Sequence, residues 1–271
     1  MIIGNREFLD KRTYIMGILN VTPDSFSDGG KHNQIDFAIS QTERMIKEGA
    51  DVIDVGGEST RPGYTKISDY EEIQRITPVI KEIKKRFDIP ISVDTYKPEV
   101  ARSALENGAD MINDIWGLKY HTDMANIIQA CNASCCLMHN RNNTDYKSFV
   151  DDVISDLRAS IDIAYSAGIS QNKILIDPGV GFAKSYEQNL EITNNLERLH
   201  ALGMPVLLGA SRKSMIGLAL ELPVEERLEG TLATTVLAVM KGCRFVRVHD
   251  IKENKRVITM TERILYGTDT N

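Results

Sequence analysis

The sequence is poor in cysteine and has no long hydrophobic run. Its 271 residues include only four cysteines, too few for a disulfide scaffold, and three of them crowd residues 131–136 without metal-ligand spacing. We therefore expect Cys131, Cys135, Cys136 and Cys243 to be reduced and buried. No apolar run approaches the roughly 18 residues of a membrane helix, and residues 1–7 turn polar too early for a secretory signal. These absences predict a cytoplasmic protein that does not enter a membrane.

An excess of positive charge is also missing. The chain has 32 lysines and arginines against 38 aspartates and glutamates, which gives a formal net charge of −6. Proteins that coat nucleic acids or adhere to membrane surfaces rely on an excess of cations. Both classes are therefore disfavoured, and any anionic ligand must meet a local cluster of cations.

Short apolar, β-branched runs recur along the chain, and a longer segment with helical periodicity follows each of them. The runs begin about every 33 residues, close to the roughly 31 residues per unit of an eight-stranded (β/α) barrel. They cover residues 14–19, 51–55, 90–93, 111–113, 135–138, 174–176, 205–208 and 245–248.

This pattern predicts an α/β fold, a single (β/α)8 TIM barrel with parallel strands. Parallel strands that are buried on both faces read as continuous apolar runs, as these do. The main alternative is an open doubly wound sheet, which usually has a Gly-x-Gly-x-x-Gly turn after its first strand; residues 20–30 contain no such turn. Residues 1–271 are predicted to form one domain with a frayed tail at residues 267–271.

Polar residues end nearly every run, at the strand ends where a barrel carries its reactive groups. One polar residue in such a place is often only a helix cap, but so many together indicate a site. They are Asn20, Glu58, Thr60, Arg61, Asp94, Asn113, Asp114, His139, Asp177, Ser211, Arg212, Lys213, Arg247 and His249.

These polar residues fall into two sets. Asp94, Asn113 and Asp177 offer carboxylate and amide groups that suit a flat heterocycle with adjacent N–H donors. The second set is cationic and suits phosphate or pyrophosphate; it comprises Arg61, Lys213, Arg247 and His249. We therefore predict a bipartite site, with a polar pocket inside the barrel and an anion clamp at its rim.

Two glycine-bounded loops, residues 20–30 and 56–63, follow the first two predicted strands. Such loops at a barrel mouth are candidates for lids that close over substrate and exclude water. The alternative is that they are merely flexible connections.

Five motifs are similar to those of the dihydropteroate synthase family. They lie at residues 17–30 (GILNVTPDSFSDGG), 56–63 (GGESTRPG), 177–182 (DPGVGF), 211–213 (SRK) and 247–250 (RVHD). The first two are long and specific, the others occur in the matching order, and the resemblance runs from about residue 14 to residue 265. It implies condensation of 6-hydroxymethyl-7,8-dihydropterin pyrophosphate with 4-aminobenzoate to give 7,8-dihydropteroate and pyrophosphate, with Mg²⁺ as cofactor and a homodimer as the assembly.

The resemblance also implies residue roles. The pterin would contact Asp94, Asn113, Met138, Asp177 and Lys213, and the pyrophosphate would contact Asn20, Arg247 and His249. The 4-aminobenzoate site would comprise Phe26, Thr60, Arg61, Pro62, Phe182 and Ser211. Mg²⁺ would lie near Asn20, with Asp24 a less secure ligand, and Arg212 would support the site rather than touch substrate.

The implied reaction is a substitution at a methylene carbon with early departure of pyrophosphate, so it needs no protein nucleophile. Mg²⁺ and cations such as Lys213 and Arg61 would stabilise the departing charge, and Asp28 could steady the positive charge left on the pterin. The weakly basic amine of 4-aminobenzoate needs a dry pocket more than deprotonation. Sulfonamides that mimic 4-aminobenzoate are expected to inhibit.

Two other functions remain open at this point. A methyltetrahydrofolate-dependent methyltransferase would share the pterin pocket but has no need of the pyrophosphate clamp or the two lids. A noncatalytic paralogue would bind pterin without turnover. The roles of His139 and Asp54 are also undecided, since His139 suits a structural role and Asp54 an orienting one.

Overall fold

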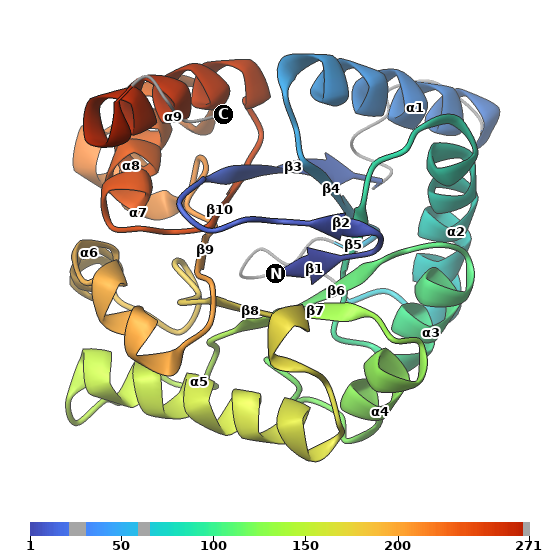
Figure 1. Cartoon of the computed structure of the whole chain (residues 1–271), viewed down its shortest axis with the longest axis horizontal. Helices are drawn as coiled ribbons and strands as arrows, with labels where there is room; N and C mark the ends of the chain where they lie inside the picture. Colours follow the sequence, from blue (N-terminus) through green and yellow to red (C-terminus); the bar gives the residue numbers. More distant parts are fainter. Residues whose placement is uncertain (22–30, 59–65, 268–271) are drawn as a thin grey trace.

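A computed structural model describes residues 1–21, 31–58 and 66–267 of the chain. In this part of the chain, eight parallel strands form a nearly closed barrel surrounded by helices, as predicted (Figure 1). The strands are β3 (Tyr14–Asn20), β4 (Val52–Gly56), β5 (Ile91–Asp94), β6 (Met111–Asp114), β7 (Ser134–Met138), β8 (Ile174–Asp177), β9 (Leu207–Leu208) and β10 (Phe245–Val248). Each corresponds to one predicted apolar run.

The barrel closes between its two end strands. Hydrogen-bonded pairing runs in the order β8-β7-β6-β5-β4-β3-β10-β9. A parallel bridge joins Ile176 to Val206, and the Ile176 N–H donates to the Pro205 carbonyl at 3.1 Å. The strand predicted at residues 205–208 is thus present but short, with Leu207–Leu208 as its regular part.

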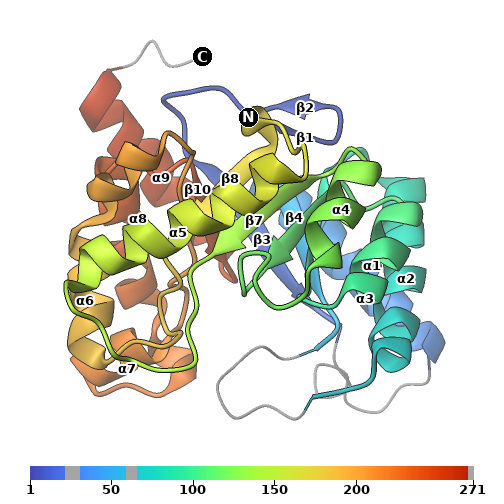
Figure 2. The same cartoon turned by 90° about the horizontal axis from the view of Figure 1, so that it is seen from below.

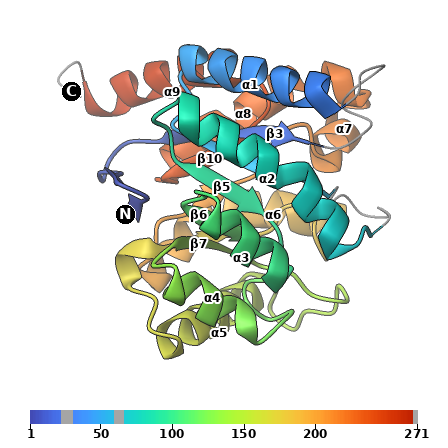
Figure 3. The same ribbon diagram turned by 90° about the vertical axis from the view of Figure 1, so that its right-hand side faces the viewer.

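A ring of helices covers the outside of the strands, and neighbouring helices lie side by side (Figure 3). They are α1 (Lys31–Glu48), α2 (Asp69–Arg86), α3 (Pro98–Glu106), α4 (Asp123–Ala130), α5 (Phe149–Ser166), α6 (Tyr186–Asn194), α7 (Ser214–Leu220), α8 (Leu228–Met240) and α9 (Ile251–Tyr266), with short 3-10 turns η2 (Gln171–Lys173), η3 (Leu196–Leu202) and η4 (Val224–Glu226). None of the helices within the described ranges is long and apolar enough to cross a membrane.

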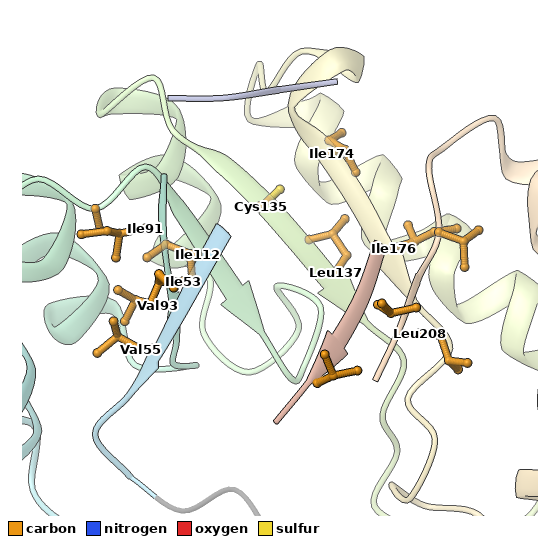
Figure 4. Close-up of a cluster of buried hydrophobic side chains, with 14 of the residues drawn as sticks. Ile53, Val55, Ile91, Val93, Ile112, Cys135, Leu137, Ile174, Ile176 and Leu208 are labelled. Carbon is orange, nitrogen blue, oxygen red and sulfur yellow. The ribbon is translucent and has the colours of Figure 1, made fainter. Parts of the chain in front are cut away.

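Alternating side chains on each strand face opposite sides of the barrel wall. The outward side chains, such as Ile53, Val93 and Leu137, pack under the helices in one large apolar layer (Figure 4). A separate apolar cluster includes Met16, Met111, Leu175 and Phe245 from four of the strands. These residues alternate with the outward set, so they fill the lower interior of the barrel.

A short antiparallel hairpin, β1 (Ile2–Ile3) and β2 (Arg6–Glu7), precedes the barrel and was not predicted. Ile3 and Phe8 belong to the same apolar cluster as the lower barrel interior, and the Ser134 hydroxyl donates to the Ile2 carbonyl at 2.6 Å. The hairpin therefore covers one end of the barrel, opposite α7 (Figure 2). The other end is the mouth, to which the C-terminal ends of the strands lead.

The prediction for the cysteines is correct for three of them. All four are free thiols, and Cys135, Cys136 and Cys243 are buried. The prediction was wrong for Cys131, which is exposed. This residue is the C-cap of α4, beyond the last residue of the buried helix face.

Candidate active site

Four of the predicted site residues, together with Asp54, lie on the inward face of the barrel near its mouth. Asp54, Asp94, Asn113, Asp177 and Arg247 come from β4, β5, β6, β8 and β10 respectively. They stand above the apolar lower interior, because the same strand alternation that points Val52, Met111, Leu175 and Phe245 inward returns two residues later to these positions. The expected convergence of polar groups is therefore real.

Arg247 is the centre of this polar layer. Its Nε donates to Asp54 Oδ2 at 2.6 Å and its Nη2 to Asp94 Oδ2 at 2.9 Å, while Asn113 Nδ2 donates to Asp54 Oδ2 at 3.3 Å. The guanidinium thus lies inside the barrel between two carboxylates rather than standing alone at the rim. Asp54, whose role the sequence left open, orients both Arg247 and Asn113.

Part of this polar layer has no partner within the described residues. Asp54 Oδ1, Asp94 Oδ1 and Ser92 Oγ are buried and accept or donate no hydrogen bond there. Burial, with the nearby negative charge of Asp54, raises the pKa of Asp94 to about 7 despite the opposing effect of Arg247. Buried polar atoms without partners are rare in native proteins, so these oxygens mark a place where a polar ligand or water belongs.

Asp177 and Lys213 form a second group at the mouth. The Gly179 N–H donates to Asp177 Oδ1 at 2.7 Å, and the Lys213 ammonium donates to the Val180 carbonyl and lies 4.9 Å from the centre of the Phe182 ring. Burial lowers the pKa of Lys213 to about 8, although the charge of Asp177 opposes the shift. Burial raises the pKa of Asp177, because it disfavours the charged form of the carboxyl group as it does that of the ammonium.

The turn that carries these contacts requires glycine. Gly179 has a φ of 71°, and a Cβ atom there would lie 2.0 Å from the His139 carbonyl oxygen. Any side chain at this position would therefore force the loop away from β7.

Ser211 and His249, which follow the neighbouring strands β9 and β10, meet beside this group. The Ser211 hydroxyl and His249 Nδ1 are 2.9 Å apart, and the His249 N–H donates to the same hydroxyl oxygen at 3.3 Å. Arg212, which follows Ser211 in its motif, turns away, and its Nε and Nη2 donate to Asp250 Oδ2 and Oδ1 at 3.0 and 2.5 Å. Its guanidinium is thus bound within the protein, as expected of a supporting residue.

Some of the other predicted residues lie in the part of the chain that the structure describes, and some lie outside it. Met138 is buried in a small apolar cluster with Tyr96 and Ile115, and Phe182 packs against that cluster. Asn20 is exposed at the end of β3. Outside the described residues lie Asp24, Phe26, Asp28, Thr60, Arg61 and Pro62.

A buried ion cluster beside the second predicted lid was missed. Lys97 Nζ donates to Glu58 Oε2 and Glu72 Oε2, both at 2.7 Å, and to the Ile67 carbonyl at 2.8 Å. Tyr96 donates to Glu58 Oε1 at 3.0 Å. Glu58 thus anchors the chain at residue 67 rather than facing substrate. The sequence offers one sign of this cluster, because Glu72 lies on the apolar face of its helix. A carboxylate buried there must be paired with a cation.

Comparison with known proteins agrees with this geometry. The family model described as "Pterin binding enzyme" matches residues 16–249. A curated dihydropteroate synthase from Clostridium beijerinckii is 61% identical over 98% of this chain and 99% of its own length.

Solved structures give the same result. A dihydropteroate synthase from Clostridium difficile, determined in the presence of pteroic acid, superposes with a TM-score of 0.92 at 50% identity, covering 96% of this chain and 98% of the other. A Yersinia pestis dihydropteroate synthase in a sulfonamide drug complex gives a TM-score of 0.91 at 38% identity, covering 99% of both chains.

The barrel, the polar layer at its mouth and the family match define a pterin-binding enzyme. Within that class the chain belongs to the dihydropteroate synthase family, whose members are transferases of folate biosynthesis. The resemblance noted from the motifs is therefore confirmed, and the relatives favour this activity over the methyltransferase alternative.

The lowered pKa of Lys213 predicts an alkaline limit to activity. As the pH rises through about 8, Lys213 loses its charge, so it no longer balances Asp177 or attracts an anionic substrate. The value of kcat/KM for the pterin substrate should fall above that pH. Lys213→Arg, which stays charged, should remove this limb even if its overall rate is lower. A wild-type profile that stays flat to pH 9.5 would show that Lys213 does not titrate in this range.

Proposed function

We propose that the polar layer inside the barrel binds the pterin ring of 6-hydroxymethyl-7,8-dihydropterin pyrophosphate. The ring presents adjacent N–H donors, and Asp94 Oδ1, which has no hydrogen-bond partner in the part of the chain that the structure describes, is a buried acceptor beside Asn113. Asp177 Oδ2 and Lys213 would bind the same ring from the other side, with Met138 packing on it. The single observation that carries this proposal is the unsatisfied carboxylate oxygen at the centre of the site.

We assign the pyrophosphate to Asn20, Arg247 and His249. The bonds of Arg247 to Asp54 and Asp94 use two of its five N–H groups, which leaves donors for an oxyanion. The His249 imidazole is held by Ser211, so its ring is oriented before substrate arrives. Asn20 ends β3 and His249 follows β10, at the strand ends, while Arg247 reaches them from the polar layer.

We assign 4-aminobenzoate to Phe182 and Ser211, together with Phe26, Thr60, Arg61 and Pro62 of the two predicted lids. The Lys213 ammonium over the Phe182 ring joins this side of the mouth to the pterin side. The Clostridium difficile relative was determined with pteroic acid, a molecule that contains both moieties, and the Yersinia pestis relative with a sulfonamide. Both ligands support a shared mouth for the two substrates.

Catalysis in this proposal is electrostatic. Lys213 and Arg61 would stabilise charge on the departing pyrophosphate, while Asp28 would steady the positive charge that develops on the pterin. The amine of 4-aminobenzoate would attack the methylene carbon, the bond to pyrophosphate would break, and the amine proton would pass to solvent. No protein side chain is required as a nucleophile.

We infer that Mg²⁺ binds together with the pyrophosphate, near Asn20. Across residues 1–21, 31–58 and 66–267, no group of three His, Cys, Asp or Glu side chains is arranged to hold a metal. Mg²⁺ commonly takes one or two protein oxygens and completes its shell with substrate phosphates and water, and the exposed Asn20 amide is such a donor. When bound, the ion would neutralise charge on the leaving group.

The function is tested by a pyrophosphate-release assay with both substrates and Mg²⁺. Release should require all three components, and a sulfonamide should inhibit in competition with 4-aminobenzoate. Removing Mg²⁺ with a chelator should abolish turnover, and adding it back should restore it. Release without 4-aminobenzoate, or full activity at saturating sulfonamide, would contradict the proposal, and binding of pterin without turnover would identify a noncatalytic protein.

Asp177→Asn tests the pterin pocket. The variant keeps the shape of the side chain but removes a buried charged acceptor, so pterin-pyrophosphate affinity should fall by at least about 1 to 3 kcal/mol. Isothermal titration calorimetry measures this loss. Asp162→Asn, on the exposed side of α5, is the matched control and should bind normally. Unchanged affinity in Asp177→Asn would remove this residue from the pocket.

We propose that the protein works in a reducing compartment, where its four thiols stay free. We also propose that it forms a homodimer with α8 at the interface. In its thirteen residues α8 has one charged side chain, Glu229, and Val236 and Leu237 are only partly buried. In sedimentation velocity, the wild-type chain should run as a dimer and Val236→Arg as a monomer. Met260→Arg on α9, where Met260 is 61% exposed, should remain dimeric. A wild-type monomer at micromolar concentration would refute this assembly.

A further inference from the structure

A second polar network lies directly behind the loop that connects β8 to α6. His139 follows β7 and is fully buried. Its Nε2 is 3.0 Å from Asp156 Oδ2, and its Nδ1 is 2.9 Å from Lys184 Nζ. Arg141 Nε donates to the same oxygen of Asp156 at 2.5 Å. None of these residues has a place in the proposed reaction.

The proton positions in this network follow from chemistry. The hydrogen bonds of Asp156 to His139 and Arg141 lower its pKa despite partial burial, so it is a carboxylate that can only accept, and Nε2 of His139 must carry the proton and donate to it. Nδ1 of the neutral ring is then the acceptor for Lys184. His139 is therefore neutral in a single tautomer, consistent with burial, which lowers its pKa to about 4 despite the opposing hydrogen bond to Asp156.

Lys184 ties this network to the loop. Besides His139, its Nζ donates to the Gly179 carbonyl and to the Phe182 carbonyl, both at 3.0 Å. Burial lowers the pKa of Lys184 to about 7, and in its charged form these contacts use all three of its N–H groups. The two carbonyls lie at either end of the tight turn, which the Phe182 N–H closes by donating to the Gly179 carbonyl at 3.1 Å.

The turn held in this way carries two groups of the proposed site. The Val180 carbonyl accepts from Lys213, and the Phe182 ring lies under the Lys213 ammonium. The backbone of Asp177 belongs to β8 and is held by the ladder of the barrel, although the Gly179 N–H of the turn donates to its Oδ1. A change in the turn should therefore move the Phe182 ring more than Asp177.

We propose that Lys184 and His139 are positioning residues, which fix the turn at residues 179–182 so that the Phe182 ring is correctly placed for 4-aminobenzoate. This inference rests on the proposed function. Neither residue touches substrate. His139 acts through Lys184, by giving the ammonium an uncharged acceptor inside the protein.

Paired substitutions at residue 139 separate positioning from general packing. The amide oxygen of Asn can accept from Lys184 much as Nδ1 does, whereas Leu offers no acceptor. His139→Asn should therefore keep the KM for 4-aminobenzoate within about twofold of wild type, and His139→Leu should raise it about tenfold, the scale of one hydrogen bond from a charged donor. The Kd for the pterin substrate, which also depends on Asp94 and Asn113 on β5 and β6, should change less than this KM in both variants. Equal KM values in the two variants would overturn the proposal.

Lys184→Met provides the second test, with Lys147→Met on the exposed side of the preceding loop as its control. Lys184→Met should raise the KM for 4-aminobenzoate about tenfold with kcat much less affected, and adding His139→Leu should cost little more, because both changes remove the same contact. Independent, additive effects, or a folded Lys184→Met variant with wild-type KM, would contradict the pairing.

Nitrogen-15 NMR of the wild-type imidazoles keeps this inference separate from the proposed function. At pH 7 His139 should show one protonated nitrogen, Nε2, and one unprotonated nitrogen, Nδ1, and the pattern should change in Lys184→Met. If the protein lacked synthase activity but gave this spectrum, the proposed function would fail and the pairing would stand. If the protein were an active synthase but both nitrogens of His139 carried a proton, the proposed function would stand and the pairing of His139 with Lys184 would fail.

Discussion

The contact of Arg247 with Asp54 and Asp94 is the interaction on which the interior of this barrel depends. Two carboxylates cannot be buried side by side without a cation, because desolvation and mutual repulsion both oppose their charge. The guanidinium satisfies one oxygen of each and leaves the others buried without a partner among the described residues. A protein selected for stability alone would gain by replacing this group with apolar side chains, so its presence is best explained by ligand binding.

The fold makes this arrangement possible by dividing the barrel interior into two parts. The lower part is apolar and is covered by the β1–β2 hairpin, while the upper part is polar and leads to the mouth. Both parts are built by inward-facing side chains of the same strands, two residues apart along each strand. The polar groups are therefore held on the most rigid elements of the chain, and the turns after β8 and β9 bring Phe182 and Ser211 to them.

The strands were predictable because parallel strands that are buried on both faces are continuously apolar, as at residues 14–19 and 174–176. The same positions showed which polar residues converge. The hairpin was missed because two-residue strands have no period to detect. The place of Arg247 was only partly foreseen, since the sequence indicates which way a strand residue points but not which distant carboxylate it meets. For the same reason, nothing local to His139 revealed Lys184, which lies 45 positions further along the chain.

The central claim is that a ligand with N–H donors completes the buried carboxylate group around Arg247. A crystal structure of the protein with the pterin pyrophosphate and Mg²⁺ tests it most directly. The account predicts a pterin N–H within hydrogen-bonding distance of Asp94 Oδ1, with Asp54 still bound to Arg247. A pterin ring bound elsewhere, with Asp94 Oδ1 still lacking a donor from the ligand, would contradict it.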